Sequence, residues 1–168
     1  MSQPRYALYF APDPGSALWR FGSQALGYAA ATGESLPIPP VSGIPPQRLP
    51  EIVADPVRYG FHATLKPPFR LAEGRTEDGL MAAVAAFAAA ERAFVLPPLE
   101  VSALGAFLAL TVPGRPEALH GLADRTVEHF DPWRAPMDAA ERQKRIGSGL
   151  GARETQHLDR WGYPYVFD

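Results

Sequence analysis

The sequence predicts an α+β fold, and two kinds of pattern support that prediction. Residues 5–10 (RYALYF) and 58–66 (RYGFHATLK) alternate side chains in the way of half-buried strands. Residues 76–93 and 116–130 instead repeat apolar side chains every three or four positions, which is typical of amphipathic helices. A chain of 168 residues has the usual size of one domain, so we expect a single domain over residues 1–168.

The first half of the chain predicts one helix and one long irregular segment. Asp13 is a candidate N-cap for a helix over residues 14–31, with Pro14 in its first position and Gly33 beyond its end. Its expected buried face is Leu18, Phe21, Ala25 and Tyr28. Residues 35–57 contain seven prolines, which predicts an ordered excursion without a regular element.

The second half predicts further helices around one apolar stretch. Thr76 is a candidate N-cap for the helix at 76–93, whose expected buried face includes Leu80. Residues 94–112 predict one or two buried strands, broken at Pro97, Pro98 and Gly105. Two more helices are expected over residues 138–146 and 152–161, the second of them ending near Gly162.

Composition excludes several classes of protein. A formal net charge of -2 and a pI near 6.1 argue against a general polyanion binder, so no duplex nucleic acid partner is expected. The absence of cysteine excludes disulfides and thiolate chemistry. No run approaches the roughly 18 apolar residues of a membrane span. These observations predict a cytoplasmic protein that does not bind membranes, and they leave its oligomeric state open.

One predicted strand carries a row of polar side chains. In a strand over 58–66, alternate residues share a face, and here that face is Arg58, Gly60, His62, Thr64 and Lys66. An imidazole can exchange a proton near neutral pH, a threonine hydroxyl can donate to a phosphoryl oxygen, and a lysine adds positive charge. The row therefore suits a phosphate site. A half-exposed strand also shows polar residues on one face without any function, and geometry alone favours that simpler interpretation.

The tetrapeptide HATL changes that balance, because H-x-T before an apolar residue on a strand resembles the signature of the 2H phosphoesterase superfamily. The segments RYALYFAPDPGSALW, RYGFHATLKPPF and LDRWGYPYV together resemble its DUF1045 branch, which is associated with phosphonate metabolism. The resemblance implies two lobes of duplicated β-α units, with antiparallel sheets flanking a central groove. We place the lobe boundary at roughly 94–115.

The resemblance also implies a reaction. The chain is expected to be a metal-independent phosphoesterase that opens a small cyclic phosphate, either a nucleotide 2',3'-cyclic phosphate or a ribosyl cyclic phosphate. His62 and Thr64 would be catalytic, Lys66, Arg58 and Tyr6 would contact the substrate, and no cofactor or metal would be needed. The alternative is a non-catalytic protein that binds a phosphorylated ligand or an RNA end. Arg142 and Arg145 are further candidate cations, although such charge runs usually face solvent.

The sequence departs from the superfamily in one respect. The superfamily uses two H-x-T motifs, yet none of His120, His129 and His157 is followed by x-Thr. In the first repeat, a certain number of residues separates the first strand from His62. The same number of residues, counted from the corresponding strand of the second repeat, places the strand with the second H-x-T near or beyond the last residue. We therefore expect a chain truncated before its second H-x-T.

Overall fold

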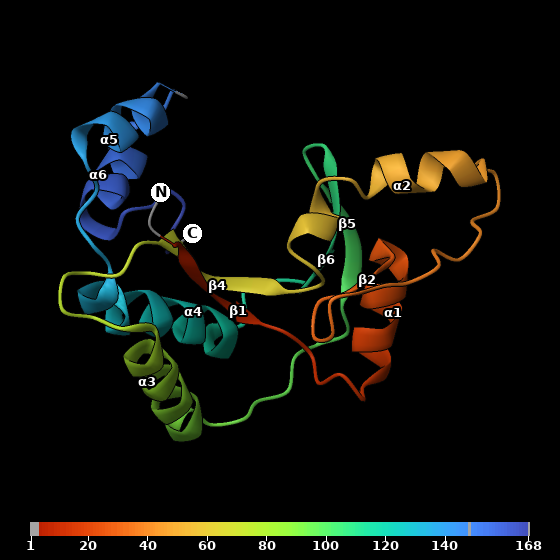
Figure 1. Ribbon diagram of the computed structural model, residues 1–168, viewed down its shortest axis with the longest axis horizontal. Coiled ribbons are helices and arrows are strands. Elements are labelled where there is room, and N and C mark those ends of the chain that lie inside the picture. The colour runs from red at the N-terminus through yellow and green to blue at the C-terminus, as the bar shows by residue number, and fades with distance from the viewer. Residues whose placement is uncertain (1–3, 148, 168) are drawn as a thin grey trace. The chain divides into compact units, whose positions relative to one another are not determined.

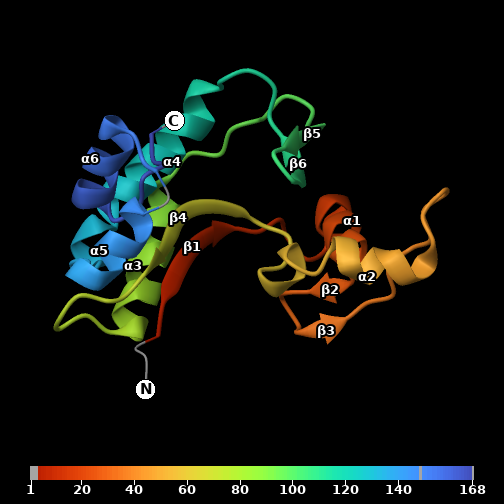
Figure 2. The same ribbon diagram turned by 90° about the horizontal axis from the view of Figure 1, so that it is seen from above.

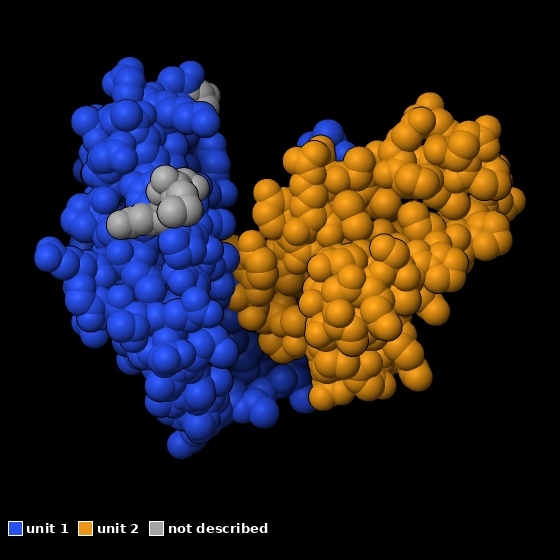
Figure 3. All heavy atoms as spheres, viewed as in Figure 1, with its two compact units in different colours: residues 1–8, 65–168 blue, residues 9–64 orange. Residues whose placement is uncertain are grey.

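The computed structural model describes residues 4–147 and 149–167, and it has the predicted α+β class (Figure 1). Six α-helices and three small two-stranded antiparallel sheets make up the regular structure of these residues. The chain divides into two compact units, residues 1–8 with 65–168 (unit 1) and residues 9–64 (unit 2), coloured separately in Figure 3. The predicted lobe boundary at 94–115 lies within unit 1, and the bilobal domain over 1–168 stays a prediction.

The core of unit 1 lies between a strand and two helices. Strand β4 (Ala63–Phe69) pairs with β1 (Tyr6–Phe10), and Phe69 meets Leu80 of α3 (Glu77–Ala90) in the core. Phe130, which follows α4 (Glu117–His129), is fully buried in the same cluster. As predicted, Thr76 caps α3, because its hydroxyl accepts a hydrogen bond from the amide of Gly79 at 3.1 Å.

The last two helices of unit 1 follow the sequence closely. Helices α5 (Ala139–Ile146) and α6 (Ala152–Trp161) lie side by side (Figure 2). The carboxylate of Asp138 accepts a hydrogen bond from the amide of Glu141 at 2.7 Å and so caps α5. Gly162 ends α6 in the left-handed conformation, with φ of 77°, which glycine adopts without a steric cost.

The apolar stretch at 94–112 forms a hairpin, and its predicted burial is wrong. Strands β5 (Glu100–Leu104) and β6 (Phe107–Thr111) pair in register around Gly105, which has φ of 61°. Val101 is 72% exposed and Leu108 is 78% exposed. A sheet of only two strands has little surface with which to cover its own side chains, so apolar content alone did not imply burial.

Helix α1 of unit 2 (Ala17–Leu26) is shorter than predicted. Its N-cap is Ser16, whose hydroxyl accepts a hydrogen bond from the amide of Trp19 at 3.1 Å, whereas Asp13 accepts from Gly15 in the turn before it. Gly27 ends the helix with φ of 69°, and the chain continues into the small sheet of β2 (Tyr28–Ala29) and β3 (Glu34–Ser35). The expected end at Gly33 is therefore wrong.

The buried face of α1 also differs from the predicted one. Phe21 is 58% exposed, while Gly22 and Ser23 are buried. An added Cβ at Gly22 would lie 2.1 Å from the ring of Phe61, so this ring packs directly on the helix backbone. Small residues therefore form the contact face, because they let a phenylalanine approach closely.

The proline-rich segment is ordered, as predicted, but it is not free of regular structure. It contains 3₁₀ turns at Pro46–Arg48 and Pro56–Arg58, and between them the short helix α2 (Leu49–Ile52). Proline suits the first turn of a helix, where its missing amide hydrogen is not needed. Across the described parts of the chain, no helix is long and apolar enough to cross a membrane.

Candidate functional site

The candidate site begins where the chain turns into β4. Arg58 ends a 3₁₀ turn, Gly60 has φ of 71°, and the strand starts only at Ala63. The predicted strand over 58–66 is therefore wrong at its start, because a left-handed residue interrupts the extended chain before His62. The shared face that we predicted for Arg58, Gly60 and His62 does not form by strand alternation.

Close packing on both sides fixes the turn that precedes His62. A Cβ at Gly60 would lie 2.5 Å from the Cβ of Ala30, and the ring of Phe61 rests on Gly22 of α1. Only glycine combines the positive φ with this close approach. The close packing of Gly60 and Phe61 within unit 2 therefore fixes the backbone position of His62.

His62 and Thr64 come together as the sequence predicted. The Nδ1 atom of His62 lies 2.9 Å from the carbonyl oxygen of Gly60, and Nε2 lies 3.2 Å from the hydroxyl oxygen of Thr64. A carbonyl can only accept, so Nδ1 carries the hydrogen and donates it. In the neutral ring Nε2 is then the acceptor for the Thr64 hydroxyl, and it is the nitrogen able to take up a proton.

Two tyrosines that the sequence interpretation missed contact the imidazole. The ring of Tyr9 lies 3.8 Å from that of His62 between centroids, at an interplanar angle of 30°, and the ring of Tyr59 lies 6.3 Å away. Burial raises the pKa of Tyr9 above its usual value, and the nearby Tyr59 raises it further. Tyr59 lies only three residues before His62 in the sequence, so its proximity to His62 was a usable signal, whereas Tyr9 required the pairing of β1 with β4.

Lys66 does not share the exposed surface of Thr64. Its side chain is 2% exposed, and the ammonium donates a hydrogen bond to the carbonyl oxygen of Val127 at 2.9 Å. Burial lowers its pKa to about 8, an effect that Asp131 at 3.9 Å opposes and Arg134 reinforces. Within unit 1 this lysine stabilises the end of α4, and its predicted contact with substrate stays a prediction.

The other two predicted substrate contacts have separate surroundings. The hydroxyl of Tyr6, in unit 1, donates to the Glu77 carboxylate at 3.0 Å, which raises the pKa of Tyr6. Arg58 is exposed in unit 2, and its side chain forms no hydrogen bond or ion pair with the other described residues, while its backbone amide donates to the carbonyl oxygen of Asp55 at 3.4 Å. Their roles stay predictions. Within the described residues, no three histidine, aspartate or glutamate side chains gather in a group that could hold a metal ion.

A family profile matches residues 64–168, well over half of the chain, and its description is "Protein of unknown function (DUF1045)". The chain belongs to the DUF1045 family. The match begins at Thr64 and covers β4, both long helices of unit 1 and the α5–α6 pair. It confirms the branch that the sequence segments indicated. No solved structure matches the chain significantly.

Two curated proteins are similar to nearly the whole chain. Both carry the name ribose 1,5-bisphosphate phosphokinase PhnN. The protein from Janthinobacterium sp. (strain Marseille) is 47% identical over 165 residues, and that from Laribacter hongkongensis (strain HLHK9) is 36% identical over 164 residues. Each alignment covers 98% of this chain, but the chain spans only 36% and 37% of the length of these relatives.

These names correct the reaction that we expected from the sequence. A phosphokinase transfers a phosphoryl group, so the relatives do not support a metal-independent phosphodiesterase that opens a cyclic phosphate. The error came from the H-x-T motif, because the hydrogen-bonding groups that suit a phosphate oxygen serve many phosphate reactions equally well.

Proposed function

We propose that the chain is the acceptor-binding part of a ribose 1,5-bisphosphate phosphokinase that works in phosphonate metabolism. Its substrate is a phosphorylated ribose, and His62 and Thr64 of unit 2 contact a phosphoryl oxygen of that sugar. The observation that supports this most is the 47% identity, over almost the whole chain, to a protein of that name. The phosphorylated sugar also retains the class of partner that the sequence suggested, a small phosphorylated substrate.

The paired side chains of His62 and Thr64 support a phosphate contact chemically. A protonated imidazole donates through both nitrogens, so Nε2 can donate to an anionic oxygen while Nδ1 keeps its bond to Gly60. The Thr64 hydroxyl, 3.2 Å away, can then turn to donate to the same phosphoryl group. Charge-assisted hydrogen bonds of this kind are about twice as strong as neutral ones.

The sequence around the two lysines supports the proposal that this chain binds the sugar substrate and not the nucleotide. The nucleotide-binding P-loop ends in G-K-S or G-K-T, where the lysine reaches the β- and γ-phosphates. In this sequence Lys66 lies between Leu65 and Pro67, and Lys144 lies between Gln143 and Arg145. Neither lysine fits that loop, so the proposal gives these 168 residues the acceptor side of the reaction.

The finer resemblance remains part of the proposal. We propose that the segment of His62 and strand β4 derives from the 2H phosphoesterase fold, with its duplicated lobes and groove. The phosphoesterase reaction itself is not part of this proposal. A cytoplasmic location is proposed with it. The 3.2 Å contact within the H-x-T motif supports this relationship.

Calorimetric titration with ribose 1,5-bisphosphate tests the proposed function. We expect binding by the wild type and a loss of about tenfold or more in His62→Ala, since a hydrogen bond to a charged group contributes about 1.5 to 3 kcal/mol. His120→Ala is the matched control, because His120 lies on α4 of unit 1. Equal affinities of His62→Ala and His120→Ala, with both variants folded, would remove His62 from the site.

A further inference from the structure

Three aromatic rings of unit 2 gather at the candidate phosphate contact. Between ring centroids, Tyr9 lies 3.8 Å and Tyr59 lies 6.3 Å from His62. Tyr9 is 36% exposed and Tyr59 is 59% exposed, so both rings reach the surface beside the imidazole. Single exposed aromatic side chains are common and need no function. Here, however, two tyrosines flank the one imidazole to which we assign a phosphate contact, and we call Tyr9 and Tyr59 the tyrosine pair.

The two tyrosines contact His62 in different ways. Tyr9 is tilted by 30° from the imidazole plane and covers one face of it at close range, while the Gly60 carbonyl holds Nδ1 at 2.9 Å. The imidazole is therefore held through its face and through its edge, with Nε2 directed towards Thr64. Tyr59 is tilted by 50° and leaves more than half of its own surface uncovered. Tyr9 thus supports the imidazole, and Tyr59 offers an exposed aromatic surface next to it.

The hydroxyl groups of the tyrosine pair are open to a ligand. Neither phenol oxygen forms a hydrogen bond with the described residues. Burial raises the pKa of Tyr9, so this phenol keeps its hydrogen at neutral pH. A neutral phenol both donates and accepts a hydrogen bond. The tyrosine pair therefore combines an apolar ring face with polar groups that suit the hydroxyls of a sugar.

A sugar ring has the two kinds of surface that an exposed tyrosine matches. The face of an aromatic ring is negative and its edge is positive, so the C–H groups of a furanose pack on the ring face. The sugar hydroxyls then stay at the rim, where a phenol oxygen can reach them. Because Tyr59 lies only 6.3 Å from His62, a phosphate at Nε2 and a ring on Tyr59 can belong to one small molecule. Inorganic phosphate has no ring and gains nothing from Tyr59.

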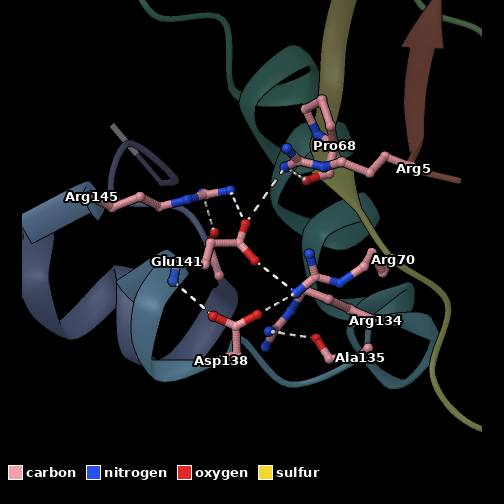
Figure 4. A network of polar contacts seen from close by, with 9 residues as sticks. Arg5, Pro68, Arg70, Arg134, Ala135, Asp138, Glu141 and Arg145 are labelled. Atoms are coloured by element: carbon pink, nitrogen blue, oxygen red, sulfur yellow. Dashed lines mark hydrogen bonds and ion pairs between the residues drawn. The ribbon is translucent and has the colours of Figure 1, made fainter. Parts of the chain in front are cut away.

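A second polar cluster, in unit 1, connects the end of β4 with α5 (Figure 4). Glu141 accepts hydrogen bonds from Arg70 and Arg145, each at 2.8 Å. The cavity among these side chains has a volume of about 20 Å³, which holds about one water molecule. A sugar phosphate is larger than this space, so the surface beside His62 in unit 2 is the better place for its ring and its phosphate.

We propose that Tyr59 binds the sugar ring of the substrate, and that Tyr9 is a positioning residue which holds the His62 imidazole for the phosphate. The ligand is a furanose phosphate, whose phosphate group meets His62 and Thr64 and whose C–H face lies on the ring of Tyr59. These roles rest on the proposed function, and they add the contact that distinguishes a sugar phosphate from the free ion.

Calorimetric titrations with ribose 5-phosphate and with inorganic phosphate, at constant ionic strength, test the role of Tyr59. Tyr59→Leu should bind ribose 5-phosphate about two- to tenfold more weakly than the wild type, which is the factor that a packed aromatic ring contributes in side-chain pairs. Its affinity for inorganic phosphate should not change. Tyr59→Phe keeps the ring and should retain most of the affinity for ribose 5-phosphate. Tyr165→Leu is the matched control, because Tyr165 is 54% exposed but lies in unit 1.

His62→Ala separates the role of Tyr59 from the proposed function, since it should weaken the binding of both ligands. If Tyr59→Leu binds ribose 5-phosphate as tightly as Tyr165→Leu does, while His62→Ala loses both ligands, the role of Tyr59 is overturned and the proposed function stands. An equal loss of both ligands in Tyr59→Leu would also overturn it, because Tyr59 would then act on the imidazole and not on the sugar. If His62→Ala binds both ligands as the wild type does, the proposed function fails and the roles of both tyrosines fail with it.

NMR spectra of His62 test the role of Tyr9. The ring current of a stacked tyrosine moves the carbon-bound proton resonances of the imidazole, so these resonances should shift in Tyr9→Leu and stay near their wild-type positions in Tyr9→Phe. Both ligands should bind more weakly to Tyr9→Leu by the same factor, because both depend on the imidazole, and Tyr9→Phe should restore their affinities. Unchanged affinities in Tyr9→Leu, whether or not the His62 resonances shift, would show that Tyr9 does not position the imidazole for the phosphate.

Discussion

His62 and Thr64 form a hydrogen-bonded pair in which the imidazole Nε2 lies 3.2 Å from the threonine hydroxyl oxygen. The pair exists because Gly60 supplies a carbonyl acceptor 2.9 Å from Nδ1, which selects one tautomer of the ring. Nε2 is therefore the nitrogen that faces Thr64. A left-handed glycine two residues before the histidine thus determines which nitrogen a phosphate oxygen would meet.

The tautomer of His62 is the first prediction. Because Nδ1 donates to Gly60, long-range ¹H–¹⁵N correlation spectra of the neutral ring should show the hydrogen on Nδ1 and an unprotonated Nε2. Thr64→Val removes the hydroxyl that donates to Nε2, so the Nε2 resonance should shift while Nδ1 stays protonated. A ring with its hydrogen on Nε2 would contradict the orientation described here.

The stability of unit 2 should depend on Gly60 in particular. Gly33 and Gly60 both have positive φ, at 76° and 71°, but a Cβ at Gly33 meets no atom within 4 Å. Gly33→Ala should therefore lower the unfolding free energy by about 1 to 2 kcal/mol, which is the cost of holding an alanine in the left-handed conformation. Gly60→Ala should cost about 1 to 3 kcal/mol more, because its Cβ would lie 2.5 Å from that of Ala30.

Denaturant titration of both variants measures this difference. We also expect Gly60→Ala to alter the His62 resonances, since the turn that holds the Nδ1 acceptor must move. Gly33→Ala should leave those resonances in place. Equal losses of unfolding free energy in the two variants would mean that Ala30 does not pack against Gly60.

The buried ammonium of Lys66 predicts a pH dependence of folding. Its pKa is lowered from 10.5 to about 8 in the folded protein, mainly by burial. Between these two values the unfolded chain binds more protons than the folded chain, so the unfolding free energy rises with pH. The rise attributable to this group is about 3 kcal/mol between roughly pH 8 and pH 10.5.

Lys66→Met isolates this contribution. Methionine has no proton to lose, so the difference in unfolding free energy between wild type and variant should shift in favour of the wild type as pH rises from 8 to 10.5. Below pH 8 the difference should be constant, because the lysine is charged in both states there. A difference independent of pH across the whole range would argue that the ammonium is solvated and not buried against Val127.

The sequence predicted the elements that local rules determine. Thr76 caps α3 and Gly162 ends α6, because a capping hydroxyl and a left-handed glycine act within one turn of the helix. Burial was harder to predict. The apolar stretch 94–112 was predicted to form buried strands, yet Leu108 within it is exposed, because burial depends on which elements pack against a strand.

Of the candidate site, the sequence predicted only the proximity of His62 and Thr64. H-x-T spacing brought His62 and Thr64 together, since residues two apart lie on one side of an extended chain. The face that we predicted Lys66 to share with Thr64 does not form, because the Lys66 side chain is buried in unit 1 while Thr64 is exposed. A contact of Lys66 with substrate stays a prediction. Tyr9 was missed because only the pairing of β1 with β4 brings it to the imidazole.

The most direct test of the proposed function is an NMR titration of the chain with ribose 1,5-bisphosphate. We expect saturable shifts of the His62 ring nitrogens and of the Gly60 and Thr64 amides, and we expect these shifts to be lost in His62→Ala but not in His120→Ala. Saturable binding that leaves His62, Gly60 and Thr64 unshifted, or no binding to the folded wild type, would contradict a phosphosugar site in unit 2.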